Sequence, residues 1–233
     1  MYRNKSGCLC ALVCLLAGIP SAYAADGTMA SPKAPGAPVT SSFIGPLWQV
    51  VAPAGGSASI SDGHLFIGVP GGSNHEALIP RNDTVRVVQP IGDNNFDVSI
   101  KIDSLPVATE RNTSQGIMML SDDEDFITFA LTTDGNKIGL NLSAHVIADG
   151  VATTALVTDA DFSQYRNPIY LRLRRTGSTY TALYSMDGVD WTQVSSFHDS
   201  KVPTSIGPFA SNYNPYPTDA VPVVMSVNWF KSR

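Results

Sequence analysis

The sequence predicts an all-β protein in which two antiparallel sheets pack face to face. Three strand-length runs follow one another in residues 170–194, where apolar and polar residues alternate, which gives each strand one inward and one outward face. The two turns between these runs, 176–178 and 187–188, contain glycine, which tolerates the positive φ that short hairpins need. No segment shows the period of 3.6 residues that is typical of a helix, so we expect strands to form the core.

Strand signals recur along the whole chain. In order, they predict strands at 64–69, 85–89, 96–102, 115–120, 126–132 and 137–142, then the three strands of 170–194 and a last strand at 221–230. Residues that favour turns separate these strands at 62–63, 70–72, 92–95, 134–136 and 149–150. Segment 96–102 has the clearest alternation, because every second residue is apolar: Phe96, Val98, Ile100 and Ile102. We expect these four side chains to face the core and the residues between them to face solvent.

The N-terminus has the pattern of a secretory signal peptide. Arg3 and Lys5 precede an apolar run, and Ala22-Tyr23-Ala24 matches the small-residue pattern of a cleavage site. We expect residues 1–24 to be this signal peptide, residues 25–42 a tether rich in Pro, Ala and Ser, and residues 43–233 one folded domain. The apolar run is too short to span a bilayer, so we expect no membrane insertion and a protein secreted to the periplasm or the extracellular space.

Composition argues against several classes of partner. All three cysteines lie within residues 1–24, so the mature chain would have no disulfide and would depend on packing for its stability. Removal of that segment takes away Arg3 and Lys5, which leaves 13 of the 15 basic residues against 20 acidic ones. This negative net charge argues against nucleic acid and anionic membranes as partners, because both attract basic surfaces.

Three segments of the chain resemble a known family. They are 170–194, Ile206-Gly207-Pro208-Phe209-Ala210, and Val69-Pro70-Gly71-Gly72-Ser73-Asn74-His75. Together they are similar to the concanavalin A-like domain at the C-terminus of family 43 β-xylosidases, which also occurs in free-standing secreted bacterial proteins. The resemblance extends from about Phe43 to Phe230 and implies a concanavalin A-like jelly-roll sandwich of two curved antiparallel sheets. It implies carbohydrate as a partner but no particular reaction, because one fold hosts many activities.

The same resemblance implies a polar site on the concave sheet. His75 follows the Gly-Gly turn, and Arg86 and Gln89 lie on the next strand at positions that are polar in the family. Together with Gln115 they would form a groove for an acidic or polyhydroxylated ligand, since Arg can bind a carboxylate through two parallel hydrogen bonds. The alternative is a network within the sheet, in which the arginine pairs with a neighbouring acid.

Aromatic and amide residues near turns are candidates for the rim of this groove. Asn212 and Tyr213 belong to a loop, 212–216, that is rich in rings and amides, and Trp191 follows a tight turn. Sugars bind to such surfaces through stacking on rings and through hydrogen bonds to their hydroxyl groups. For Trp191 the alternative is a core position at the end of the sandwich, because tryptophan is mostly buried.

The chain offers few groups for catalysis or for metal binding. Glycosidases use two nearby carboxylates, and none of the glutamates has a strand spacing that would form such a pair: Glu76, Glu110 and Glu124. A polysaccharide lyase needs a base and a group that neutralises a uronate, roles that suit His75 with Arg86 and Gln115. No zinc spacing or EF-hand loop occurs, so we expect no cofactor, and the acidic residues 122–125 leave a structural calcium ion as the alternative.

We therefore expect a secreted, lectin-like domain that binds a polysaccharide or oligosaccharide in a concave groove. A polysaccharide-active enzyme, either a lyase or a glycoside hydrolase, is the first alternative. A structural or adhesive surface protein, whose groove is filled by its own side chains, is the second.

Overall fold

The computed structural model describes residues 39–41, 43, 45–77, 82–91, 95–107, 110, 112–133, 140–149, 151–158 and 167–232. The expected signal peptide, 1–24, and residues 25–38 of the expected tether lie outside these ranges. The same holds for the expected turn at 134–136, for residues 92–94 of the expected turn at 92–95, for residue 150 of that at 149–150, and for residues 137–139 of the expected strand at 137–142. All described residues belong to one compact unit, Gly36–Arg233.

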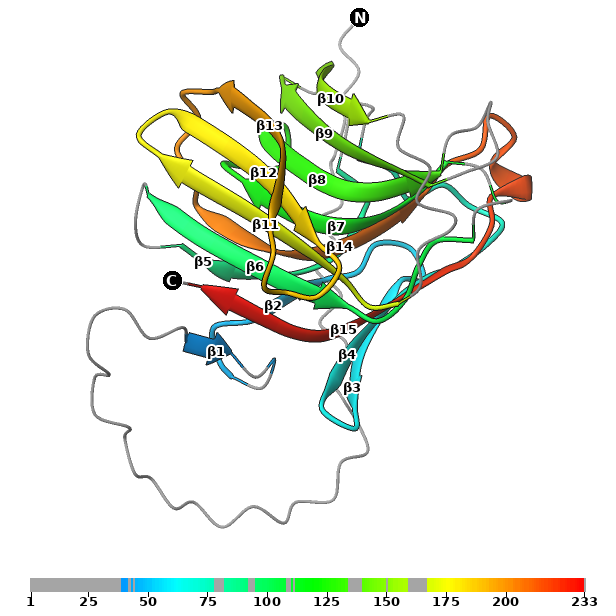
Figure 1. Cartoon of the computed structure of the whole chain (residues 1–233). Coiled ribbons are helices and arrows are strands. Elements are labelled where there is room, and N and C mark those ends of the chain that lie inside the picture. Colours follow the sequence, from blue (N-terminus) through cyan, green and yellow to red (C-terminus); the bar gives the residue numbers. More distant parts are fainter. Residues whose placement is uncertain are drawn as a thin grey trace, which may run out of the picture. The chain divides into compact units, whose positions relative to one another are not determined.

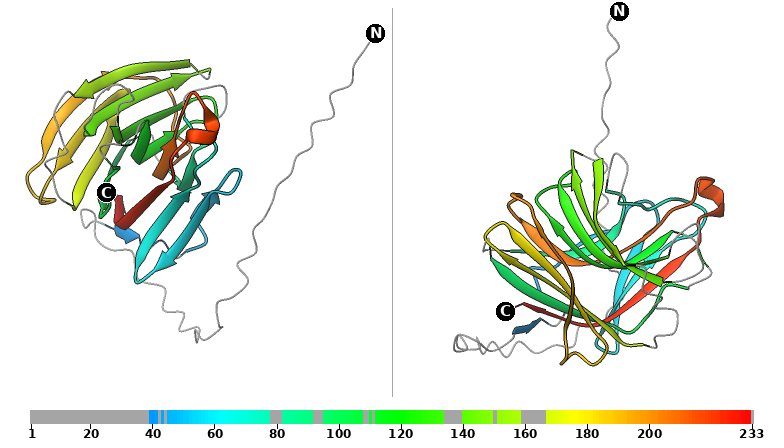
Figure 2. Two further views of the ribbon diagram at one scale, coloured as in Figure 1. Left: turned by 90° about the vertical axis from the view of Figure 1, so that its right-hand side faces the viewer. Right: turned by 45° about the horizontal axis from the view of Figure 1, so that its top comes forward.

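Two antiparallel sheets form this unit, as predicted (Figure 1). Sheet A has the strand order β13 (Thr192–His198), β12 (Thr179–Ser185), β11 (Ile169–Thr176), β6 (Phe96–Ile102), β15 (Val223–Ser232), β4 (His64–Val69) and β3 (Ser57–Ser61), and β1 (Val39–Ser41) also pairs with β15. Sheet B has the order β10 (Val151–Thr158), β9 (Leu140–Ala148), β8 (Phe126–Thr133), β7 (Thr113–Leu120), β14 (Ser205–Asn212), β5 (Val85–Pro90) and β2 (Gln49–Val51). The sheets form two layers, which are seen from two further directions in Figure 2. Within the described part of the chain, the short η2 (Pro217–Asp219) is the sole helix, and no helix there has the length and hydropathy of a membrane span.

The main hydrophobic core lies between the two inner faces, where strand alternation directs the apolar side chains. The four apolar residues of β6 are all buried in it: Phe96, Val98, Ile100 and Ile102. Sheet B contributes the alternating residues of its central strands, among them Ile117, Met119, Ile127 and Phe129. Full burial of each large apolar side chain contributes about 1.5–3 kcal/mol, so this core accounts for stability without disulfides.

Strand β14 is absent from the sequence prediction because Gly207 and Pro208 lie at its centre, where both residues are atypical of a strand. The ladder to β5 passes over these two residues and pairs Ile206 with Gln89 and Phe209 with Arg86. A Cβ atom on Gly207 would lie 2.0 Å from the carbonyl oxygen of Val87, so the close approach of the two strands requires glycine.

Sheet B also carries a second apolar cluster on its outer face. The cluster consists of Val88, Met118, Leu120, Phe126, Ala130, Ile147 and Phe209. Part of the segment that leads into β5 lies against it, because Ala77 packs on the cluster and the Asn82 side chain contacts the Met118 sulfur at 3.2 Å. One half of the outer face of sheet B is therefore apolar and buried, whereas the other half carries polar side chains.

Candidate functional site

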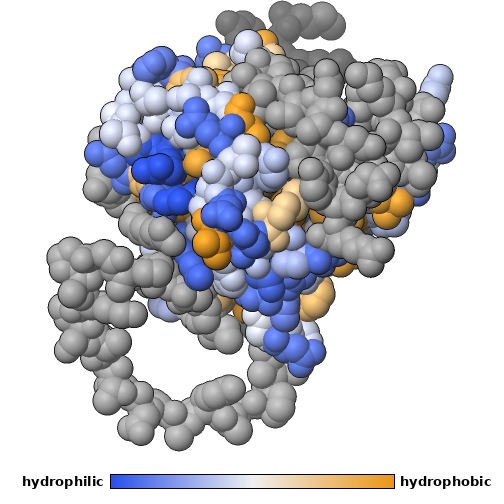
Figure 3. Space-filling view, viewed as in Figure 1, coloured by the Kyte–Doolittle hydropathy of each residue, from blue (hydrophilic) through white to orange (hydrophobic). Residues whose placement is uncertain are grey.

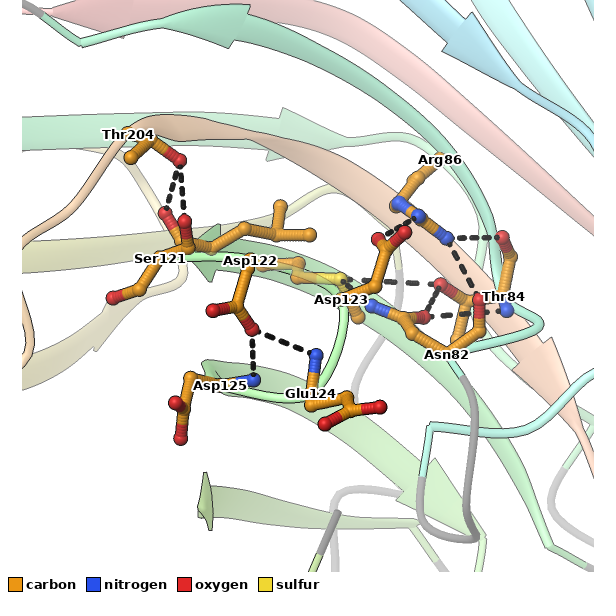
Figure 4. A network of polar contacts seen from close by, with 11 residues as sticks. Asn82, Thr84, Arg86, Ser121, Asp122, Asp123, Glu124, Asp125 and Thr204 are labelled. Atoms are coloured by element: carbon orange, nitrogen blue, oxygen red, sulfur yellow. Dashed lines mark hydrogen bonds and ion pairs between the residues drawn. The ribbon is translucent and has the colours of Figure 1, made fainter. Parts of the chain in front are cut away.

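Arg86 lies on the outer face of sheet B, opposite Phe209 on β14, but both terminal nitrogens of its guanidinium group bond to protein groups, and its buried Nε has no partner in the described part of the chain. The side chain is only 4% exposed and donates hydrogen bonds to the carbonyl oxygens of Asn82 (3.0 Å) and Thr84 (3.2 Å) and to the carboxylate of Asp123 (2.6 Å), as Figure 4 shows. Burial lowers the pKa of Arg86, and the negative charge of Asp123 opposes that shift. This is the network that was the alternative for Arg86, and it holds the segment before β5 to the turn after β7.

Gln89 and Gln115 do not share a face with Arg86, which corrects the expected convergence. Gln89 is three residues from Arg86 along a strand, so it points to the other side of the sheet, where it pairs with the core residue Ile206. Gln115 pairs with the core residue Ala210, is buried, and accepts a hydrogen bond of 2.7 Å from the Ser104 hydroxyl. Both side chains therefore lie on the inner side of sheet B rather than in an outer groove.

His75 and Asn212 are both buried and pair with each other through their backbones. Their side chains bind carbonyl groups of neighbouring loops. The Asn212 side chain accepts a hydrogen bond from the His75 backbone at 2.9 Å and donates to the carbonyl oxygens of Pro70 (2.9 Å) and Val221 (2.6 Å). The Nε2 atom of the His75 ring lies 3.2 Å from the carbonyl oxygen of Pro53 and 3.3 Å from that of Ala54. The polar side-chain atoms of His75 and Asn212, which the sequence predicted to bind a ligand, thus form hydrogen bonds within the protein.

Trp191 lies on the other sheet. The guanidinium carbon of Arg172 is 5.3 Å from the centre of its ring, and Arg172 faces outward from sheet A because it alternates with the core residues Leu171 and Leu173. Arg172 also donates two hydrogen bonds to Asp97. Figure 3 shows a largely hydrophilic surface with scattered hydrophobic residues over β11 and β12. Trp191 is therefore not at the rim of a site that includes Arg86.

Tyr213, the remaining predicted residue, lines a pocket of about 350 Å³ on the polar half of the outer face of sheet B. The register of the strands explains which residues meet there. Four polar residues are directly paired across β9, β8, β7 and β14. We call them the polar row: Asn141, Thr132, Ser114 and Ser211. All four residues line the pocket.

The next row of the sheet creates the hollow because its side chains are small. Ser143 on β9, Ala130 on β8 and Gly116 on β7 are direct neighbours across the strands, and Phe209 on β14 follows them. A Cβ atom on Gly116 would lie 2.2 Å from the carbonyl oxygen of Phe129, so this position in the row cannot carry a side chain without movement of the backbone.

Most polar side chains of the pocket have no hydrogen-bond partner among the described residues, in contrast to His75 and Asn212. These side chains are Asn112, Ser114, Thr128, Asn141, Ser143, His145, Ser211 and Tyr213. Ser143 is 2% exposed, and its hydroxyl oxygen is buried and unpaired within the described part of the chain. Buried polar groups in proteins are almost always paired, so an unpaired one in a pocket indicates a ligand or an ordered water molecule.

Two titratable groups of the pocket are shifted toward their neutral forms. Burial raises the pKa of Glu76, with a smaller contribution from the negative charge of Asp83. Burial lowers the pKa of His145, which keeps its imidazole neutral over a wider range of pH. Neutral groups suit hydrogen bonding to an uncharged, hydroxyl-rich molecule.

The acidic residues 122–125 are explained by local structure. The Asp122 carboxylate accepts hydrogen bonds from the backbone of Glu124 (2.9 Å) and Asp125 (2.7 Å), and Asp123 pairs with Arg86 (Figure 4). Within the described ranges, no three His, Cys, Asp or Glu side chains gather as metal ligands would. A structural calcium ion stays a prediction.

The sequence contains a signal for this pocket that the prediction missed. Asn141, Ser143 and His145 occupy alternate positions of β9, so one face of that strand is polar. The prediction ended this strand at residue 142, whereas β9 extends to Ala148, so the alternation of polar and apolar residues up to His145 was overlooked.

Comparisons with known proteins place the fold. No family model and no curated protein sequence matches the chain. Among solved structures, the GH43 BlXynB protein from Bacillus licheniformis matches with a TM-score of 0.65 and 18% identity, over 83% of this chain and 38% of that one. A GH43 glycoside hydrolase engineered to display both endo-xylanase and exo-arabinofuranosidase activity matches with a TM-score of 0.63 and 14% identity, over 92% of this chain and 43% of that one.

A third neighbour corresponds to the sandwich over nearly its whole length. The CBM2 module of the evolved Dit of Lactobacillus casei BL23 phage J-1 matches with a TM-score of 0.58 and 11% identity, over 83% of this chain and 94% of that one. At these identities the likeness shows the fold. It confirms the expected jelly-roll sandwich and its resemblance to a part of family 43 enzymes, of which this chain spans well under half.

Proposed function

We propose that this protein binds carbohydrate in the pocket on the outer face of sheet B. The observation that carries the proposal is the set of polar side chains that line this pocket and have no hydrogen-bond partner among the described residues. Sugar hydroxyls donate and accept hydrogen bonds, and so do the hydroxyl, amide and imidazole groups gathered here. The structural neighbours agree with a carbohydrate ligand, since several are glycoside hydrolases and one is a carbohydrate-binding module by name.

Tyr213 is the residue of the sequence prediction that we retain as a ligand contact. It lies beside the polar row, where its ring can stack on a sugar and its hydroxyl can form a hydrogen bond. We assign His75 and Asn212 a supporting role, because they fix the end of β14 from which Tyr213 emerges. A purely structural protein would be expected to pair its polar groups internally, as His75 and Asn212 do, and most polar side chains of the pocket do not follow that pattern.

A glycan array followed by calorimetry tests the proposal. We expect the purified chain to bind at least one neutral polysaccharide, and Ser114→Ala to weaken that binding about two- to tenfold by removing one hydrogen-bonding group of the pocket. Thr181→Ala is the matched control, because Thr181 lies on the outer side of β12 in sheet A, opposite Arg174. The absence of binding to every glycan, or equal losses in both variants, would contradict the proposal.

Cleavage of a glycan is the second candidate, favoured by one observation. Glu76 and His145 line the same pocket, and burial shifts the pKa of each toward its neutral form, a feature that is common among catalytic acids and bases. Of the described pocket residues, however, Glu76 is the only carboxylate, whereas glycosidases generally use two. A reducing-end assay and an assay for unsaturated products, both at high protein concentration, would detect turnover, and Glu76→Gln should abolish it.

A further inference from the structure

We infer that the ligand is an oligosaccharide of at least two sugar rings that lies across strands β9, β8 and β7 along the polar row and ends at Tyr213. This inference rests on the proposed function. It concerns the length and the direction of the ligand, which follow from where the accessible polar groups lie.

The polar row offers one accessible hydrogen-bonding side chain on each of three neighbouring strands. Asn141, Thr132 and Ser114 are paired across β9, β8 and β7, and all three are half-buried. Ser211 continues the row on β14, where it is buried at 6% exposure. Because neighbouring strands lie about 4.8 Å apart, the three steps from Asn141 to Ser211 span about 14 Å.

A single sugar ring is too short for this row. Six ring atoms joined by bonds of about 1.5 Å, with a hydroxyl oxygen at either side, extend over less than half of the row. Groups at both ends can therefore contact one ligand only if that ligand has two rings or more. The row consequently favours a chain over a monosaccharide.

The other direction, along β9, is less continuous. Ser143 lies between Asn141 and His145 on that strand and is 2% exposed, so the middle of this path is recessed. A chain along β9 would cross a gap, whereas a chain along the polar row meets a half-buried polar group on every strand from β9 to β7. Ser143 and His145 then lie to one side of the chain, where they can contact a substituent.

The end of the row is held in place by its own hydrogen bonds. The backbone of Tyr213 donates to the Asn112 carbonyl oxygen at 2.9 Å, and both residues line the pocket. Just beyond, Asn74 and Asn214 exchange two hydrogen bonds, of 2.9 and 2.8 Å, between side chain and backbone. A backbone fixed in this way loses little freedom on binding, which makes Tyr213 a suitable residue to stack on the last sugar.

Calorimetric titration with xylose, xylobiose and xylotetraose, and with glucose, cellobiose and cellotetraose, tests the inference. In the series that binds, we expect the tetrasaccharide to bind at least tenfold more tightly than the monosaccharide. Asn141→Ala and Tyr213→Ala should each weaken tetrasaccharide binding about five- to tenfold, and at most one of them should affect the monosaccharide, which can occupy only one end. Thr181→Ala, on the outer side of β12 in sheet A, is the control and should leave both affinities and their ratio unchanged.

Two outcomes separate the failure of this inference from the failure of the proposed function. Equal affinities for one and four rings, or a ratio that does not change in Asn141→Ala and Tyr213→Ala, would overturn the direction and length of the ligand while leaving carbohydrate binding in place. No binding by either series or by any glycan on the array would overturn the proposed function itself. A circular-dichroism spectrum and a melting temperature like those of the wild type establish that each variant is folded.

Discussion

Replacing Ser143 by alanine removes a hydroxyl group that is buried and has no hydrogen-bond partner among the described residues. The residue lies on the outer side of β9, beside Ala130 of β8, and lines the pocket. In the unfolded chain this hydroxyl is hydrated, so folding without a ligand costs its desolvation. The alanine variant avoids that cost.

The expected change in stability follows from the burial of this group. An unsatisfied buried polar group costs about 1–3 kcal/mol, and the loss of packing around the removed oxygen offsets part of the gain. We therefore expect Ser143→Ala to raise the free energy of unfolding of the free protein by about 1 kcal/mol. For a chain of this size that corresponds to an increase in melting temperature of about 2–4 °C. Binding of a carbohydrate whose substituent reaches Ser143 should weaken by about fivefold, because that substituent loses one partner.

Urea denaturation and calorimetric titration of the same preparations measure the two effects. Ser185→Ala is a matched control, because Ser185 is equally buried but its hydroxyl donates to Asp187 at 2.9 Å and accepts from the Gly188 backbone at 2.8 Å. That variant should lose about 1 kcal/mol of stability and keep its affinity for carbohydrate. If Ser143→Ala were destabilised as much as Ser185→Ala, its hydroxyl would have a protein partner and the reasoning would be refuted.

Three further outcomes can be checked by denaturation. Arg86→Ala should lower the urea midpoint by an amount that corresponds to about 2 kcal/mol or more, because two backbone carbonyl groups lose their donor; an unchanged midpoint would show that the network is not needed. Gly116→Ala should cost about 3 kcal/mol, since its Cβ would lie 2.2 Å from a carbonyl oxygen, whereas Gly45→Ala, with no atom within 4 Å, should change stability by less than about 0.5 kcal/mol. The raised pKa of Glu76 means that its contribution to stability is present at low pH and lost as pH rises through the folded-state value. The wild type should therefore lose stability relative to Glu76→Gln as pH rises above the ordinary pKa of glutamate, about 4.3, and parallel curves would contradict this.

The candidate site shows where prediction from local pattern ends. Tyr213 was predicted because it lies in a loop rich in rings and amides, and that property is visible in a short segment. Asn141, Thr132 and Ser114 each look like an ordinary solvent-facing residue of a strand, and only the pairing of β9, β8 and β7 makes them neighbours. Pairing depends on contacts between strands that are distant in the sequence, so no single segment contains this information.

The misplaced residues have a related cause. Arg86 and Gln89 are close in sequence and polar, but an odd spacing on a strand directs them to opposite faces. His75, Arg86 and Asn212 have the chemistry of a binding site, yet whether a polar group is free for a ligand depends on what surrounds it. In this fold, backbone carbonyl groups take up their hydrogen-bonding capacity: those of the segment just before β5 for Arg86, and those of loops distant in sequence for His75 and Asn212.

By itself the sequence determined the architecture: the alternation of β4, β6, β11 and β12 and the glycine-containing turns require strands with one buried face, and such strands stack into two layers. Tertiary structure alone decided which face holds the pocket, which polar groups are left unpaired in it, and that small residues from three strands coincide to make a hollow. The physical reason is the distance along the sequence over which the deciding interactions act. Strand formation depends on the order of neighbouring side chains, whereas a site depends on strand register and burial, which are set by the whole packed molecule.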